Sequence, residues 1–203
     1  MLSRLRAAWG RLIAPLVDAL LKAGISPDAV TIGGTLAVIA VALWAFPTGH
    51  LFLGAILIGV AAVMDTVDGA MARRSGRTGP WGAFLDSTLD RFADGAIFAG
   101  LVIWFTGGGD DRLTALLALA CLVLGGIVPY ARARAEGVGA TAAVGIAERG
   151  ERLLVSLVAT GLHGLGLPLA VLTVALGILA AASLVTVVQR MLVVRKQVRE
   201  GAR

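Results

Sequence analysis

The stretch "AVTIGGTLAVIAVALWAFPTGHLFLGAILIGVAAVM", residues 29–64, decides the fold because it contains no Asp, Glu, Lys or Arg. A run of this length supplies two membrane-spanning helices of about 20 residues each. The segment "FPTGH" at 46–50 is a turn sequence between them. At this segment length only helices satisfy their own backbone hydrogen bonds in lipid, so the stretch predicts a helical hairpin within a membrane.

The rest of the chain has the same character. Of its 203 residues, 58% are hydrophobic and 15% are charged, whereas charged residues make up about 25% of soluble domains. Apolar runs follow at 95–106, 113–131 and 153–189, and "HGLGLP" at 163–168 divides the last of these. We therefore predict an all-α integral membrane protein with six transmembrane helices.

The positive charges predict an orientation. The connections at 47–50, 107–112 and 163–167 contain a single basic residue, Arg112, and the other Lys and Arg residues lie at the opposite ends of the spans. The positive-inside rule makes those opposite ends cytoplasmic. An even number of spans then places both termini in the cytoplasm, with the protein in the cell membrane.

The first 25 residues differ from the spans. Apolar residues recur at helical spacing from Leu5 to Leu20, and charged residues such as Asp18 and Lys22 fall between them. We expect residues 1–25 to form an amphipathic helix on the cytoplasmic membrane surface and residues 26–203 to form the membrane domain. The alternative, a signal peptide, is disfavoured because no A-x-A cleavage site follows and charges interrupt the apolar region.

The formal net charge of +5 raises the possibility of a nucleic-acid partner. However, the basic residues are dispersed between apolar spans and few aromatic residues are present for base stacking. Attraction to anionic membrane lipid is the simpler interpretation, and we expect no nucleic-acid partner. The single cysteine, Cys121, excludes an intrachain disulfide framework.

Four aspartates follow the first charge-free run, in "MDTVDGAMARRSGRTGPWGAFLDSTLD" at 64–90. Asp65 and Asp68 are three residues apart, and Asp86 and Asp90 are four apart. On a helix each spacing places both side chains on one face. The glycines and proline between the two pairs allow the chain to turn back, which would bring the pairs face to face at the cytoplasmic surface.

Carboxylates at such close range repel one another, so the cluster must bind protons or cations. Oxygen ligands without nearby His or Cys select Mg²⁺, Mn²⁺ or Ca²⁺ over zinc. Two divalent ions would neutralise four carboxylates, and a two-metal site is suited to phosphoryl transfer. Two alternatives remain. The aspartates could form structural ion pairs with Arg73, Arg74 and Arg91, or the protein could be an ion transporter, because carboxylates within a membrane often mark the path of an ion.

The pattern D-x₂-D-G-x₂-A-R-x₈-G-x₃-D-x₃-D resembles the signature of the CDP-alcohol phosphotransferases, without departure. Its members here are Asp65, Asp68, Gly69, Ala72, Arg73, Gly82, Asp86 and Asp90. Enzymes of this family displace CMP from a CDP-linked alcohol by attack of a hydroxyl group. The resemblance implies that the first three aspartates ligate two divalent cations, Mg²⁺ or Mn²⁺. It also implies that Asp90 is the general base and lies close to a metal.

The resemblance extends to the nucleotide site. Gly69, Ala72 and Gly82 have little or no side chain, so a nucleotide can approach the helix backbone closely, and Arg73 can bind phosphate bidentately. Helix–helix packing is the alternative role of these small residues.

The segment "ISPDAVT" at 25–31 resembles the start of the first span in the same family, which lies near the nucleotide. This places Asp28 and Thr31 at the nucleotide site. An ordinary position at a helix start is an equally good interpretation of Asp28.

The segment "PYARARAEGVGATAAVGIAERGERLL" at 129–154 resembles the actinobacterial phosphatidylinositol phosphate synthases within the family. That resemblance implies a pocket for the acceptor phosphate formed by Arg132, Arg152 and Arg190, although Arg132 stands where Lys is common. Three cations facing one dianion would make strong charge-assisted hydrogen bonds. Ordinary flanking of membrane spans is the alternative role of these arginines.

The resemblance as a whole implies a homodimeric enzyme that transfers the phosphatidyl group from CDP-diacylglycerol to inositol 1-phosphate, giving phosphatidylinositol phosphate and CMP. The active site would face the cytoplasm. Glycerol 3-phosphate, serine and phosphatidylglycerol remain alternative acceptors for the same chemistry.

Overall fold

The computed structural model of the chain describes the backbone of residues 2–146 and 148–201, with the side chains of this part except those of residues 2–11 and Asp65. Within these residues the chain forms seven α-helices and no strand. The helices are α1 (Leu2–Lys22), α2 (Pro27–Ala45), α3 (Leu51–Ser75), α4 (Pro80–Thr106), α5 (Arg112–Glu136), α6 (Arg149–Gly164) and α7 (Leu169–Gly201).

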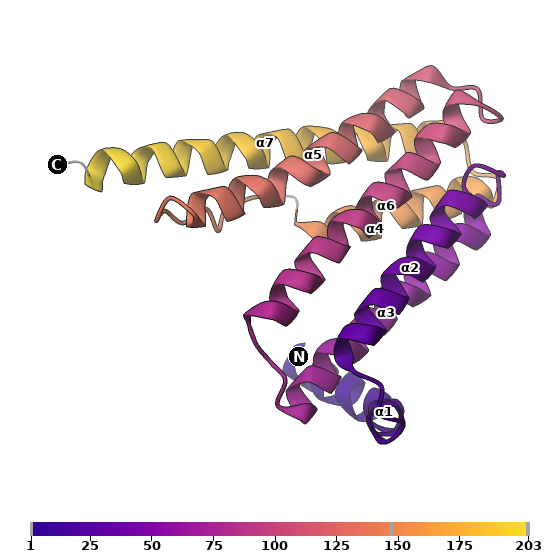
Figure 1. Ribbon diagram of the computed structural model, residues 1–203. Helices are drawn as coiled ribbons and strands as arrows, with labels where there is room; N and C mark the ends of the chain where they lie inside the picture. The colour runs from indigo at the N-terminus through magenta and orange to yellow at the C-terminus, as the bar shows by residue number, and fades with distance from the viewer. Residues whose placement is uncertain (1, 147, 202–203) are drawn as a thin grey trace.

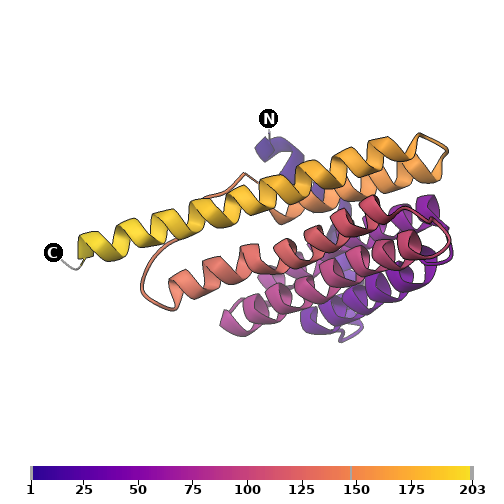
Figure 2. The same cartoon turned by 90° about the horizontal axis from the view of Figure 1, so that it is seen from above.

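Six of the helices form a closed ring, in which neighbours pack in the order α2, α4, α5, α7, α6 and α3. Figure 1 shows the short turns after α2, α4 and α6 together at one end of the ring. The connection 76–79, residues 137–146 and the last turns of α7 lie toward the opposite end, which we call the basic end. Figure 2 shows α7 extending past the end of α5 on that side.

Four helices within the described residues are long and apolar enough to cross a membrane: Pro27–Ala45, Leu51–Ser75, Arg112–Glu136 and Leu169–Glu200. The prediction of an all-helical membrane protein is thereby confirmed. By length and composition α4 and α6 do not join this set, because α4 carries several charges in its first half and α6 has only 16 residues. The count of six spans therefore stays a prediction.

Local interactions set the ends of the helices. The Ser26 hydroxyl accepts a hydrogen bond from the backbone N–H of Ala29 at 3.2 Å and so caps α2. Asp111 caps α5 by accepting from the N–H of Thr114 at 2.7 Å, and this bond lowers the pKa of the Asp111 carboxyl. Gly76 ends α3 in the left-handed conformation, with φ of 67°.

Helix α1 packs against the second half of α3. Buried side chains from both helices form the contact: Ile13, Val17, Val67 and Met71. An ion pair between Asp18 and Arg74 accompanies it. The structure has a helix over Leu2–Lys22, while the prediction of an amphipathic helix on the membrane surface stays a prediction.

Gly100 allows α4 to approach α2 closely in the buried core. A methyl group there would lie 2.5 Å from the carbonyl oxygen of Ala42, which is a backbone atom and cannot move aside easily. We expect Gly100→Ala to lower the free energy of unfolding by about 1–3 kcal/mol, the usual cost of overpacking a core. The measurement is thermal unfolding of the purified protein in detergent.

Gly126→Ala is the matched control, because a methyl group at Gly126 on α5 would meet no atom within 4 Å. Both substitutions gain the same helix propensity of about 1 kcal/mol. Equal unfolding temperatures for the two variants would contradict the close α2–α4 packing.

Candidate active site

A pocket of about 600 Å³ opens between the start of α2, the second half of α3 and the start of α4. Its lining includes most of the residues that the sequence assigned to metal and nucleotide binding: Asp28, Thr31, Asp68, Gly69, Ala72, Arg73, Gly82 and Asp86. These residues come from three helices, and the packing of α2 against both α3 and α4 brings them together.

Asp68 is held in a fixed orientation at the floor of this pocket. Its side chain is largely buried. The Thr31 hydroxyl donates to Asp68 Oδ2 at 2.6 Å, and the backbone N–H of Gly69 donates to Oδ1. Hydrogen bonds of this kind orient a carboxylate that ligates a metal. Asp86 lines the same pocket from α4 and is exposed to it.

The small residues of the pocket face open space. A methyl group at Gly82 would meet no atom within 4 Å, and at Gly69 the nearest atom is the flexible end of Arg73 at 3.4 Å. Close packing between helices therefore does not explain these two glycines. Their open surroundings favour the approach of a bound molecule to the backbone.

Asp28, which lines the pocket, is held by Trp81 of α4. The Trp81 indole Nε1 donates to Asp28 Oδ2 at 3.0 Å, joining the first turn of α2 to the first turn of α4. Ser26, not Asp28, caps α2, so Asp28 is not the capping residue of this helix. The sequence analysis missed Trp81; its signal was an aromatic residue immediately before Gly82 of the motif.

Asp90 lies one turn beyond Asp86 but lines a different cavity. This neighbouring cavity has a volume of about 780 Å³ and mostly apolar walls, and Thr66 lines both cavities. Asp90 Oδ1 lies 2.8 Å from Arg149 Nη2 of α6. Arg149 lines this cavity together with Asp90.

The predicted metal quartet is therefore only partly assembled in the part of the chain that the structure describes. Among the described side chains, no three His, Cys, Asp or Glu residues form a group that could hold a metal ion. Asp65, whose side chain is outside that part, precedes Asp68 by one turn of α3. Asp68 and Asp86 do share a pocket, and their oxygen atoms are suitable donors for Mg²⁺ or Mn²⁺.

A cluster of charged residues surrounds Asp94, one turn beyond Asp90. Asp94 is buried and lies 3.5 Å from Arg91, 3.2 Å from Arg149 and 3.7 Å from Arg152. Arg152 is only 2% exposed. The cluster explains how a membrane bundle holds a buried carboxylate, because buried charges need charged partners.

The three predicted acceptor arginines fall into two groups. Arg152 belongs to the Asp94 cluster, whereas Arg132 is an electrostatic neighbour of Arg190. Arg190 is buried and donates from Nε to the carbonyl oxygen of Val144 at 2.9 Å. Arg132 is exposed and pairs with Glu136 at 3.1 Å. In the described arrangement, then, the three arginines each have protein partners and do not form one cluster.

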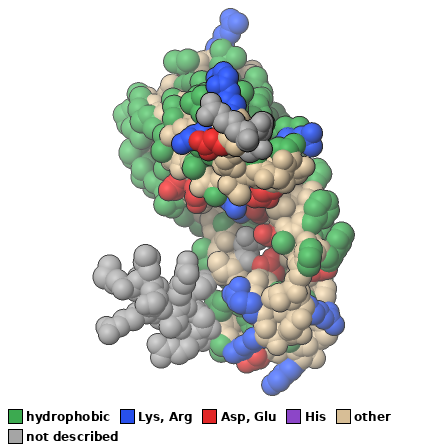
Figure 3. Space-filling model, turned by 90° about the vertical axis from the view of Figure 1, so that its left-hand side faces the viewer, with side chains coloured by type: hydrophobic (Ala, Val, Ile, Leu, Met, Phe, Trp, Pro, Cys, Tyr) green, Lys and Arg blue, Asp and Glu red, His purple; other side chains and the backbone are tan. Residues whose placement is uncertain are grey.

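Figure 3 shows the left-hand face of Figure 1 in space-filling form. Acidic side chains gather across the middle of this face, between groups of basic side chains above and below.

The sequence model of the CDP-alcohol phosphatidyltransferase family matches residues 24–195, and the chain belongs to this family. It is accordingly a membrane transferase of phospholipid synthesis. This confirms the class of enzyme predicted from the aspartate motif and sets aside the ion-transporter alternative.

Individual relatives within the family are phosphatidylinositol phosphate synthases. The chain is 48% identical over 202 residues to a phosphatidylinositol phosphate synthase of Streptomyces avermitilis, covering 97% of this chain and 83% of the relative. It is 47% identical over 203 residues to the synthase of Cutibacterium acnes, covering 97% and 98% respectively.

Solved structures agree with the sequence relatives. A crystal structure of Mycobacterium tuberculosis phosphatidylinositol phosphate synthase with CDP-DAG bound is similar with a TM-score of 0.87 at 41% identity, covering 91% of this chain and 94% of that one. A structure of the same enzyme in complex with manganese and citrate has a TM-score of 0.85, covering 89% and 87%.

Proposed function

We propose that this enzyme transfers the phosphatidyl group of CDP-diacylglycerol to a hydroxyl group of inositol 1-phosphate, giving phosphatidylinositol phosphate and CMP. The observation that carries the proposal is the pocket that Asp68 and Asp86 share with Gly69, Gly82 and Arg73. It combines oxygen donors for cations with open backbone and a guanidinium for phosphate. Its position beside an apolar cavity suits a substrate with both a nucleotide and a lipid part.

The donor set fits divalent cations. In this proposal Asp65, Asp68 and Asp86 hold two such ions, Mg²⁺ or Mn²⁺, with Asp90 nearby. When bound, the cations would neutralise the diphosphate and stabilise the charge of the leaving CMP. The hydrogen bond from Thr31 fixes the orientation of the Asp68 carboxylate. The manganese complex of the similar mycobacterial enzyme supports this assignment.

Asp28, Thr31, Gly69, Ala72, Arg73 and Gly82 would bind the nucleotide part of the donor. Arg73 contributes its guanidinium to the diphosphate, and the indole of Trp81 keeps Asp28 at the rim. The apolar cavity, whose walls include Val38, Ile58 and Ile97, is a suitable site for an acyl chain.

Asp90 would act as the general base. Its carboxylate accepts the proton of the inositol hydroxyl as that oxygen forms a bond to the phosphorus of the phosphatidyl group, and the bond from that phosphorus to CMP breaks. Arg132, Arg152 and Arg190 would bind the acceptor phosphate. Their present partners, a carboxylate or backbone carbonyls, would then be exchanged for phosphate oxygens.

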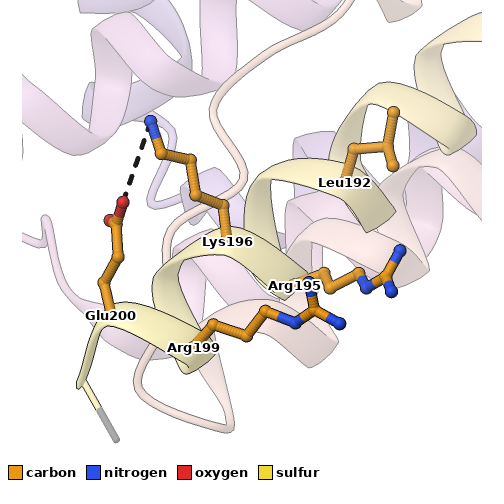
Figure 4. A pocket seen from close by; sticks show the side chains of 5 residues that line it. All are labelled: Leu192, Arg195, Lys196, Arg199 and Glu200. Carbon is orange, nitrogen blue, oxygen red and sulfur yellow. Dashed lines mark ion pairs between the residues drawn. The ribbon is translucent and has the colours of Figure 1, made fainter. Parts of the chain in front are cut away.

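The membrane topology is part of the proposal. Residues 1–25 form a surface helix, and residues 26–203 form six spans with both termini in the cytoplasm of a homodimer in the cell membrane. The charges support this orientation, because the last turns of α7 at the basic end carry Arg195, Lys196 and Arg199 (Figure 4), whereas Arg112 is at the other end. At ~1.5 Å per residue, α6 reaches most of the way across a ~30 Å hydrocarbon core.

The acceptor can be identified by supplying labelled CDP-diacylglycerol and Mg²⁺ to purified enzyme with each candidate alcohol in turn. We expect CMP release with inositol 1-phosphate and little with glycerol 3-phosphate, serine or phosphatidylglycerol. Stimulation by glycerol 3-phosphate alone would reject the proposed acceptor.

Arg152→Ala should raise the KM for inositol 1-phosphate by about 30-fold or more. The variant would leave the bound acceptor phosphate without one of its charged partners, and losing one partner of a buried charge pair costs at least ~2 kcal/mol. The KM for CDP-diacylglycerol should stay at the wild-type value. Arg112→Ala, at the opposite end of the ring, is the control and should change neither constant. An unchanged acceptor KM in folded Arg152→Ala would remove Arg152 from the pocket.

A further inference from the structure

One guanidinium connects the proposed base to the buried charge cluster. Arg149, the first residue of α6, lies with Nη2 at 2.8 Å from Asp90 Oδ1 and with Nε at 3.2 Å from Asp94 Oδ1. Asp90 and Asp94 are four residues apart and share one face of α4, so a single side chain reaches both. The carboxylate that would take the acceptor's proton is therefore paired with Arg149.

The two contacts of Arg149 have different surroundings. Asp94 is 6% exposed and also contacts Arg91 and Arg152, so it is fixed from several sides. Asp90 and Arg149 both line the 780 Å³ cavity, whereas Asp94 does not. The contact with Asp94 can thus serve as an anchor, while the contact with Asp90 is made by the two charged residues among the described side chains that line the otherwise mostly apolar cavity, where a phosphate group can reach it.

The charges favour an anion at this position. Three guanidinium groups, those of Arg91, Arg149 and Arg152, lie around the carboxylates of Asp90 and Asp94. A phosphate dianion carries more charge than a carboxylate and offers more acceptor oxygens. A guanidinium has five donors in a rigid fork, so Arg149 can keep Nε on Asp94 while its other donors turn to a phosphate.

We propose that Arg149 releases Asp90, the proposed general base, only when the acceptor's phosphate group is present. Arg149 is therefore a specificity-determining residue. Without acceptor, Arg149 holds Asp90. When the phosphate group of the acceptor arrives, Arg149 pairs with it and leaves Asp90 able to accept the hydroxyl proton. This inference rests on the proposed function and adds Arg149 to the residues that recognise the acceptor's phosphate group.

The consequence concerns water. A water molecule that replaced the acceptor would lose its proton to Asp90, attack the same phosphorus and release CMP, leaving phosphatidic acid. Water carries no phosphate, so it cannot draw Arg149 away from Asp90. Unphosphorylated inositol fails for the same reason. Arg149 therefore protects CDP-diacylglycerol from wasteful hydrolysis.

The test compares wild type with Arg149→Gln and Arg149→Lys, with Arg134→Gln as a control for loss of an exposed arginine at the basic end. CMP, phosphatidic acid and phosphatidylinositol phosphate are measured with Mg²⁺, with and without inositol 1-phosphate. For Arg149→Gln we expect acceptor-independent CMP release and the acceptor KM each to rise about tenfold, equivalent to ~1.4 kcal/mol. Arg149→Lys should restore part of the dependence of CMP release on inositol 1-phosphate, and Arg134→Gln should match wild type.

A binding measurement without metal gives a second readout. In EDTA, inositol 1-phosphate should raise the unfolding temperature of wild type and Arg134→Gln more than that of Arg149→Gln. Unchanged hydrolysis together with unchanged acceptor binding in Arg149→Gln would overturn the inference. If Arg149→Gln does not fold, the same result in Arg149→Lys decides against it. By contrast, wild type that uses another acceptor and ignores inositol 1-phosphate would overturn the proposed function itself.

Discussion

Replacing Asp90 with asparagine is expected to lower CMP release by a factor of about 100 to 10,000, the usual contribution of a positioned general base. The amide keeps the size of the side chain but cannot take the proton of the acceptor hydroxyl. The measurement is CMP release from CDP-diacylglycerol with Mg²⁺ and saturating inositol 1-phosphate.

Binding of CDP-diacylglycerol should largely survive in Asp90→Asn, because Asp90 does not line the pocket of Asp68, Gly69 and Gly82. Asp110→Asn is the matched control, since Asp110 lies in the turn at the opposite end of the ring. Full turnover in Asp90→Asn would remove Asp90 as the base. Loss of nucleotide binding along with turnover would mean that Asp90 serves the donor site instead.

Removal of divalent cations is the second change with a large expected effect. After exhaustive chelation, CMP release should fall below detection, because the carboxylates of Asp68 and Asp86 would repel the diphosphate they are proposed to hold. Added Mg²⁺ or Mn²⁺ should restore it. Asp86→Asn should need about tenfold more metal for half-maximal rate, as weakened metal ligation usually requires. Asp110→Asn should keep the wild-type metal requirement, and turnover that persists in chelator would contradict the metal assignment.

The helical hairpin was predictable because lipid imposes strong constraints on sequence. The charge-free run at 29–64 became α2 and α3 with their turn at 46–50, since a span must be long and apolar. The same constraint made α4 and α6 harder to judge. Their charged or short sequences depend on neighbours in the ring, which a local pattern does not reveal.

The shared pocket was also predictable in part. Asp68, Gly69, Gly82 and Asp86 follow a spacing specific enough to indicate a common site, and the structure places them in one pocket with Thr31. The link from Thr31 to Asp68 crosses 37 positions of sequence and was not predicted; the family resemblance had placed Thr31 only near the nucleotide. The hydrogen bond from Trp81 to Asp28 could not be predicted, because an aromatic residue beside Gly82 does not indicate its partner on another helix.

The partners of the charged residues could not be predicted. Asp90 meets Arg149, and Arg190 meets the carbonyl group of Val144, across large separations in the chain. A long arginine can reach many positions, so its partner is set by how the helices pack. The sequence placed Arg152 at the acceptor phosphate, and the structure shows that its present contact is the buried carboxylate of Asp94.

The most direct test of the account is the location of metal in crystals of this enzyme grown with manganese and measured for anomalous scattering. The account predicts two manganese ions ligated by the carboxylates of Asp65, Asp68 and Asp86, with Asp90 close to one of them. Crystals that bind no manganese at these carboxylates, or in which arginine side chains alone occupy them, would contradict the claim that paired cations hold the diphosphate here.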